Sequence, residues 1–104
     1  MISLIAVALA FLLSGCGAAP KVQQGRTALL YGDPTVATAA FQSAAQIDPN
    51  NLYFSVLPQG IWTYLGRAHY AAGRYPEARR ALEKAVPLHQ EDSMAKLYLG
   101  WASP

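Results

Sequence analysis

The sequence predicts an all-α protein built as a short array of helix-turn-helix repeats. Alanine, the strongest helix former, is abundant, and runs of the β-branched residues typical of strands are few. A second observation is self-similarity, because five positions within residues 25–44 recur at a constant offset later in the chain. A third is the apolar stripe of residues 77–86, whose spacing of three and four residues is that of one helix face.

The first 20 residues carry no charged side chain. Residues 2–13 are apolar apart from Ser3. This run is too short for a membrane-spanning helix, which takes about 20 residues, but it is typical of the core of a signal peptide. The motif Leu-Ser-Gly-Cys follows and ends at Cys16. It resembles the bacterial lipobox, which implies a signal helix over residues 1–15, cleavage before Cys16 and lipid attachment to its thiol.

Cys16 is the single cysteine of the chain, which excludes an intramolecular disulfide. The residue after it is Gly17, whereas Asp at that place commonly retains lipoproteins in the inner membrane of Gram-negative cells. The resemblance therefore implies an anchor in the outer membrane, facing the periplasm. We expect the lipidated cysteine and a short tether at residues 16–22, followed by the repeats at residues 23–104.

At the recurring positions, a small residue in the first repeat corresponds to a small residue in the second, and a large residue corresponds to a large one. They are Gly25 and Gly66, Gly32 and Gly73, Ala37 and Ala78, Phe41 and Leu82, and Ala44 and Ala85. In addition, Trp62, Leu65 and Gly66 form the pattern W-x2-L-G. These residues resemble the tetratricopeptide repeat (TPR) family, whose unit is a helix-turn-helix of about 34 residues.

The resemblance implies a short TPR-type solenoid of about two and a half repeats. The first repeat would occupy about residues 18–51 and the second about residues 59–92, with a partial third at residues 93–104. Between the first two, residues 52–58 are an extra and mostly apolar segment. This segment either packs on its own repeats or forms an exposed patch for a partner.

Local signals place the second helix of each repeat. Asp33 is a candidate N-cap ahead of Pro34, and Pro76 suits the first turn of the later helix, where a missing N–H costs nothing. Pro87 is expected to end that helix. Gly66 is small where the two helices of the second repeat must approach closely.

TPR arrays usually bind extended peptides or helices along a groove lined by their first helices. By resemblance, the candidate groove residues are Val22, Arg26, Leu29, Thr63, Arg67, Tyr70, Leu97 and Trp101. Arg26 and Arg67 occupy equivalent repeat positions and either pair with acidic groups of a partner or are ordinary solvated arginines. The Lys and Asn residues of chaperone-binding TPR clamps are absent from these slots.

Other functional classes find little support. The net charge is +2 and there is no basic run, which argues against nucleic acid. His69 and His89 have no Cys or carboxylate at metal-ligand spacing, and His69 occupies a core position of the repeat. Phosphate-binding and nucleophile motifs are missing, so we expect no enzyme activity, no cofactor and no metal.

The last residues, including Leu97 and Trp101, are apolar with no following helix to cover them. We expect either that the chain is a truncated piece of a longer array, which we favour, or that a partner or a second copy covers this end. The sequence thus predicts a lipid-anchored, non-catalytic protein-interaction scaffold of the bacterial envelope. The alternatives are an assembly factor for outer-membrane or pilus machinery and an unlipidated secreted TPR fragment.

Overall fold

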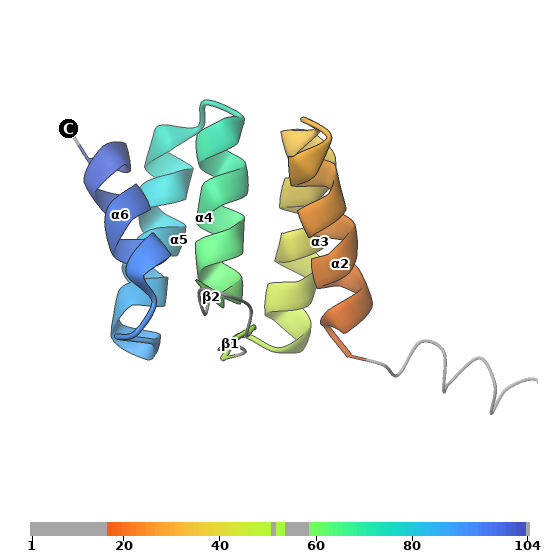
Figure 1. The fold of residues 1–104 in the computed structure, drawn as a ribbon, viewed down its shortest axis with the longest axis horizontal. Helices are drawn as coiled ribbons and strands as arrows, with labels where there is room; N and C mark the ends of the chain where they lie inside the picture. Colours follow the sequence, from red (N-terminus) through yellow and green to blue (C-terminus); the bar gives the residue numbers. More distant parts are fainter. Residues whose placement is uncertain (1–16, 51, 54–58, 104) are drawn as a thin grey trace, which may run out of the picture.

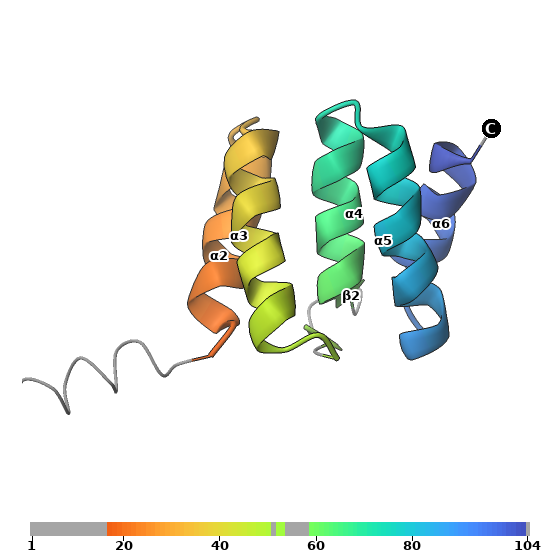
Figure 2. The same ribbon diagram turned by 180° about the vertical axis from the view of Figure 1, so that it is seen from behind.

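A computed structural model describes residues 17–50, 52–53 and 59–103. The elements in this part of the chain are α2 (Ala19–Leu30), α3 (Pro34–Ile47), β1 (Leu52–Tyr53), β2 (Gln59–Gly60), α4 (Ile61–Ala71), α5 (Tyr75–Leu88) and α6 (Ser93–Ala102). Helices α2 and α3 form one pair, α4 and α5 form a second pair beside it, and α6 lies at the end of the row (Figure 1). Seen from behind, α3 and α5 lie in front of α2 and α6 (Figure 2). The predicted all-α solenoid is confirmed.

The two helix pairs turn in the same way. Gly32 and Gly73 have φ values of +76° and +78°, a left-handed conformation that glycine adopts without steric cost. After each glycine, a backbone N–H reaches back to the preceding helix: Asp33 donates to the Ala28 carbonyl at 2.8 Å, and Arg74 donates to the His69 carbonyl at 2.9 Å. This is the Schellman helix ending, repeated at the predicted interval.

Capping agrees in part with the sequence prediction. The Val36 N–H donates to Oδ1 of Asp33 at 3.2 Å, which confirms Asp33 as the N-cap of α3. Pro87 was predicted to end α5, but the helix continues to Leu88. The helix closes with a hydrogen bond from the His89 N–H to the Ala85 carbonyl.

Glycine sets the spacing within each pair. A Cβ placed on Gly25 would lie 2.5 Å from Cε1 of Phe41, and a Cβ on Gly66 would lie 2.6 Å from Cγ of Leu82. Both distances are far below van der Waals contact, so each first helix needs glycine opposite the large residue of its second helix. The predicted close approach at Gly66 is confirmed.

Aromatic stacking joins the two pairs. The ring of Phe41 on α3 stacks on the ring of Tyr64 on α4, with centroids 5.2 Å apart and planes 24° apart. Ile61 and Leu65 are buried in the same core, which fills the space between the pairs. The α6 helix extends the array through a smaller cluster that includes Leu82 and Ala102.

The start of the solenoid corrects the predicted tether. Residues 19–22, which were assigned to it, are the first residues of α2, and Val22 is 3% exposed. Pro20 lies in the first turn, where its missing N–H costs nothing, so the Ala-Ala-Pro sequence does not keep the helix from starting. The predicted signal peptide and Cys16 lie outside the described residues.

A short strand pairing lies between the two helix pairs. Leu52 pairs with Gly60 and Tyr53 with Gln59 in a short antiparallel ladder. The alternatives for the apolar segment 52–58 concern side chains that lie outside what is described.

Among the described helices, none has the length and apolar character needed to cross a membrane.

Candidate functional site

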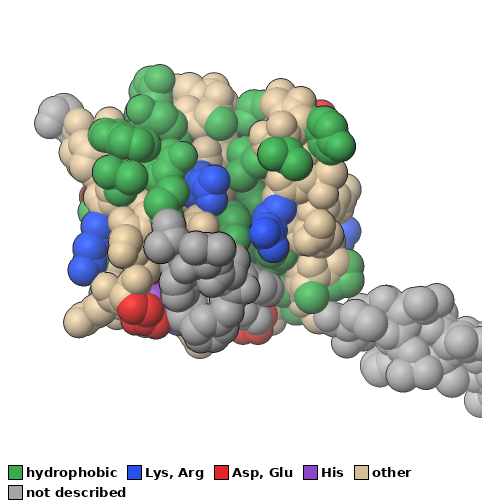
Figure 3. Space-filling view, in the orientation of Figure 1, with side chains coloured by type: hydrophobic (Ala, Val, Ile, Leu, Met, Phe, Trp, Pro, Cys, Tyr) green, Lys and Arg blue, Asp and Glu red, His purple; other side chains and the backbone are tan. Residues whose placement is uncertain are grey.

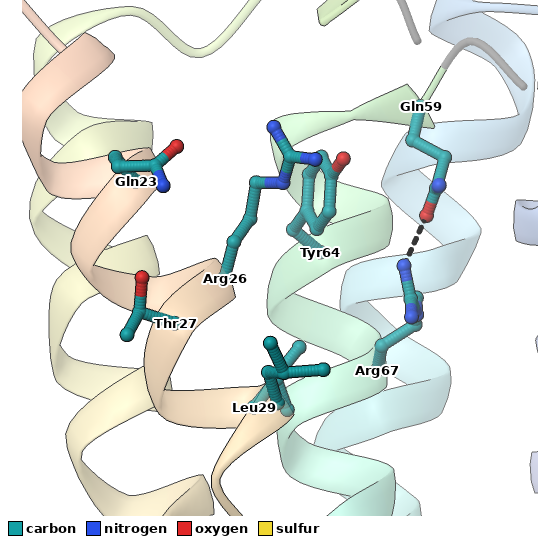
Figure 4. Close-up of a pocket in the computed structure, with 8 residues that line it drawn as sticks. Gln23, Arg26, Thr27, Leu29, Gln59, Tyr64 and Arg67 are labelled. Atoms are coloured by element: carbon teal, nitrogen blue, oxygen red, sulfur yellow. Dashed lines mark hydrogen bonds between the residues drawn. The ribbon is translucent and has the colours of Figure 1, made fainter. Parts of the chain in front are cut away.

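A cleft of about 500 Å³ opens between α2 and α4 (Figure 4). Helix α2 supplies one wall, and α4 with the end of β2 supplies the other. The lining residues are Gln23, Arg26, Thr27, Leu29, Leu30, Gln59, Tyr64 and Arg67. The cleft therefore lies between the first helices of consecutive repeats, where the sequence resemblance places a groove.

Two arginines from different repeats face one tyrosine in this cleft. The guanidinium carbon of Arg26 lies 6.0 Å from the centre of the Tyr64 ring, and that of Arg67 lies 5.6 Å from the same centre. The stacking of Tyr64 on Phe41 fixes the ring, so it is a rigid platform for both cations. Arg26 and Arg67 thus meet because the two helix pairs stack side by side.

Arg67 is held more firmly than Arg26. One of its terminal nitrogens donates to Oε1 of Gln59 at 2.5 Å, and its guanidinium carbon lies 5.6 Å from the centre of the Tyr98 ring on α6. Its Nε atom is inaccessible to solvent and has no hydrogen-bond partner among the described residues. Arg67 is consequently pre-positioned by β2 and α6.

The charge of the cleft is positive. All six acidic residues of the chain belong to the described part, namely Asp33, Asp48, Glu77, Glu83, Glu91 and Asp92. None of them lines the cleft. On this face, basic side chains lie in the middle over α2 and α4 and also at its left and right edges, whereas acidic ones appear only at its margins (Figure 3).

The structure brings together only part of the predicted groove. Arg26, Leu29 and Arg67 line the cleft. Tyr70 and Trp101 line a second hollow at the other end of the array, with Tyr75. Val22 is buried, and Leu97 is an exposed residue of α6 that lines neither hollow.

Thr63 does not belong to the groove, contrary to the prediction. Its side chain is 0% exposed, and its hydroxyl donates to Oδ2 of Asp92. Asp92 is also fully buried and accepts from the N–H groups of Gly60 at 2.8 Å and Ala95 at 3.1 Å. Thr63 is therefore part of the joint between α4 and α6.

Sequence reasoning missed Tyr64 and Gln59. Tyr64 lies three residues before Arg67 on the same helix, a spacing that places both side chains on one face. That signal was available in the sequence. No such signal in the sequence indicated Gln59, because its contact with Arg67 depends on the strand pairing that precedes α4.

The second hollow is aromatic. The ring of Tyr70 lies 5.1 Å from that of Tyr75 and 5.4 Å from that of Tyr98, and Tyr98 lies 5.1 Å from Trp101, all measured between centroids. The edge-to-face geometries of these pairs are favourable for aromatic rings. Tyr70 therefore joins α4, α5 and α6, while Trp101 remains 55% exposed.

His69 is a buried residue of α4. Burial lowers its pKa below the ordinary value of 6.5, the nearby Arg74 lowers it further, and Glu77 raises it. Its buried Nδ1 atom has no hydrogen-bond partner among the residues that the structure describes. Within the residues that the structure describes, no three His, Cys, Asp or Glu side chains are grouped to hold a metal ion.

Antiparallel helix pairs that repeat at a fixed interval, with an open cleft along their first helices, define a helical-repeat protein with the form of a binding scaffold. The family model described as tetratricopeptide repeat matches residues 28–99, and the chain belongs to this family. TPR arrays generally mediate protein–protein interactions and are generally not catalytic. No curated protein matches the chain.

Proposed function

We propose that this chain is a non-catalytic scaffold, anchored in a bacterial envelope membrane by lipid on Cys16, which binds a segment of a partner protein in the cleft between α2 and α4. The observation that carries the binding part is the cleft itself. It lies on the first helices of consecutive repeats and combines two cations with the apolar side chains of Leu29 and Leu30. A recess of this composition suits one extended chain better than a flat protein surface.

The anchor rests on the sequence around Cys16. An uncharged apolar run ends in Leu-Ser-Gly-Cys, and acyl chains on that cysteine would each contribute about 0.8 kcal/mol per buried CH2 group. Helix α2 begins at Ala19, so only Gly17 and Ala18 would separate the lipid from the solenoid. At roughly 3.5 Å per extended residue, this linker keeps the scaffold about 10 Å or less from the membrane surface.

The anchor is tested by expressing the full chain in a bacterium beside a Cys16→Ser variant. We expect the wild-type chain in the membrane fraction, with an intact mass that corresponds to cleavage before Cys16 plus acyl groups. The variant should lose the acyl mass and leave that fraction. An unmodified wild-type chain outside the membranes would contradict the anchor but would leave the cleft intact.

The binding site is tested with a photo-crosslinking amino acid at one of two matched glutamines. Gln23 lines the cleft, whereas Gln42 is an exposed residue of α3 that does not. We expect a specific crosslinked protein from position 23 in living cells and none from position 42. Equal crosslinking from both positions, or crosslinking from position 42 alone, would argue against the cleft as the binding site.

A further inference from the structure

Two positive charges line the cleft, and none of its described lining residues is acidic. The guanidinium carbons of Arg26 and Arg67 share the Tyr64 ring as a neighbour, and their distances of 6.0 Å and 5.6 Å from its centre keep them within about 12 Å of each other. Because no carboxylate lines the cleft, both positive charges border the same recess without an opposite charge beside them there. Such an arrangement is relieved by an anion that lies between them.

The hydrogen-bonding capacity of the two arginines is also incompletely used. Arg67 donates one hydrogen bond from a terminal nitrogen to Gln59, and its Nε is buried out of a ligand's reach, so the donors that a ligand can meet are its remaining terminal N–H groups. Arg26 is exposed, and its guanidinium approaches the ring of Tyr64 from α2. A guanidinium group carries five N–H donors in a planar fork that matches a carboxylate. Both arginines therefore keep donors for a ligand.

We propose that the cleft selects a partner segment with an acidic side chain, whose carboxylate binds between Arg26 and Arg67. This inference rests on the proposed function and specifies the chemistry of its ligand. Leu29 and Leu30 line the same cleft on the α2 side, so an apolar residue next to the acidic one completes the match. The ligand is thus an acidic and apolar peptide segment, with the acidic residue as its anchor.

The geometry favours a peptide over a membrane surface as the anionic partner. Arg67 is only partly exposed, its Nε is buried, and it is pinned by Gln59 and by the Tyr98 ring inside the recess. A single carboxylate on a thin chain can reach it there. A flat layer of lipid headgroups would meet the rim of the cleft before it met this guanidinium.

The test is selection of a random peptide library on the purified full chain, followed by fluorescence anisotropy with a selected peptide. We expect enrichment of Asp or Glu at one position beside an apolar residue. Changing that residue to Gln or Asn should weaken binding to the wild-type chain by about tenfold or more. Binding should also weaken as salt is raised, since the Debye length falls.

The protein variants separate the cleft from overall charge. Arg26→Gln with Arg67→Gln should weaken binding by about tenfold or more, and in this variant the peptide's own substitution should have no further effect. Lys21→Gln with Arg80→Gln removes the same charge from residues outside the cleft and should keep the affinity within about twofold. Circular dichroism checks that all variants remain helical.

Three outcomes would overturn the inference. Selected peptides that lack an acidic residue but block crosslinking at position 23 would sink it and leave the proposed function standing. No selected peptide that binds the cleft would count against both. Binding of phosphatidylglycerol vesicles that is lost in the cleft variant, with peptide binding unchanged, would replace the peptide by a membrane surface.

Discussion

The carboxylate of Asp92 accepts a hydrogen bond of 2.8 Å from the backbone N–H of Gly60, which lies 32 residues earlier in the chain. The same side chain accepts a hydrogen bond from the Thr63 hydroxyl and caps α6 by accepting another from the Ala95 N–H. One buried carboxylate thereby fixes the start of α4 against the start of α6. The position of α6 matters for the cleft, because the Tyr98 ring on α6 lies against Arg67.

Asp92→Ala is expected to destabilise the fold by about 2–4 kcal/mol, because it removes a helix cap and leaves buried donors unpaired. Urea unfolding followed by circular dichroism measures the change. Asp33→Ala is the matched control: it removes a more exposed cap of α3 and should cost about 1 kcal/mol. If the two variants lose the same free energy of unfolding, the hydrogen bonds of Asp92 to Gly60 and Thr63 add no stability beyond that of the helix cap.

Gly66→Ala is expected to destabilise the protein by about 1–3 kcal/mol, because its Cβ would lie 2.6 Å from Cγ of Leu82 and force the helices of the second repeat apart. Gly100→Ala is expected to change the stability in the opposite direction. Gly100 lies within α6, no atom of the described residues lies within 4 Å of an added Cβ, and alanine should stabilise the helix by up to about 1 kcal/mol. Thermal unfolding of the two variants checks both signs, and a neutral Gly66→Ala would contradict the close approach.

His69 is expected to make stability depend on pH. Burial, reinforced by Arg74 and opposed by Glu77, lowers the pKa of folded His69 below 6.5, so the unfolded chain takes up the proton first. Stability is therefore fully present above about pH 6.5 and is lost as the pH falls from there toward the lowered pKa.

The measurement is the urea midpoint at about pH 7.5 and about pH 5.5, on the two sides of the ordinary pKa of histidine. The midpoint should fall at the lower pH in the wild-type chain and fall less in His69→Gln. A variant with the same pH dependence as the wild type would assign the effect to other groups.

Tyr70→Ala is expected to loosen α6 while leaving the first repeat folded. The substitution removes the ring that contacts Tyr75, Tyr98 and Trp101, at a cost of about 2–3 kcal/mol for a partly buried aromatic side chain. Trp101 is the sole tryptophan left in a Trp62→Phe background, so a red shift of its emission reports the change. Hydrogen exchange should become faster in α6 and stay unchanged in α2 and α3; faster exchange throughout would contradict this.

Local rules in the sequence determined much of the fold. The recurrence of Gly25 and Gly66, and of Gly32 and Gly73, predicted two equivalent helix pairs, because helix contacts and turns of one shape demand glycine at the same places. The cap at Asp33 followed from residue type and spacing alone. These features depend on neighbours a few residues apart or on one repeated packing contact, and a sequence pattern records both.

Tertiary structure decided the site. The sequence paired Arg26 with Arg67 by repeat position, but only the stacking of α3 on α4 brings both guanidinium groups to the Tyr64 ring. Thr63 occupies a groove position by repeat register, yet it is buried because Asp92 meets it from 29 residues away. Contacts between distant segments depend on how the helices pack in three dimensions. The repeat pattern fixed which helices exist, and packing fixed which side chains remain open to a partner.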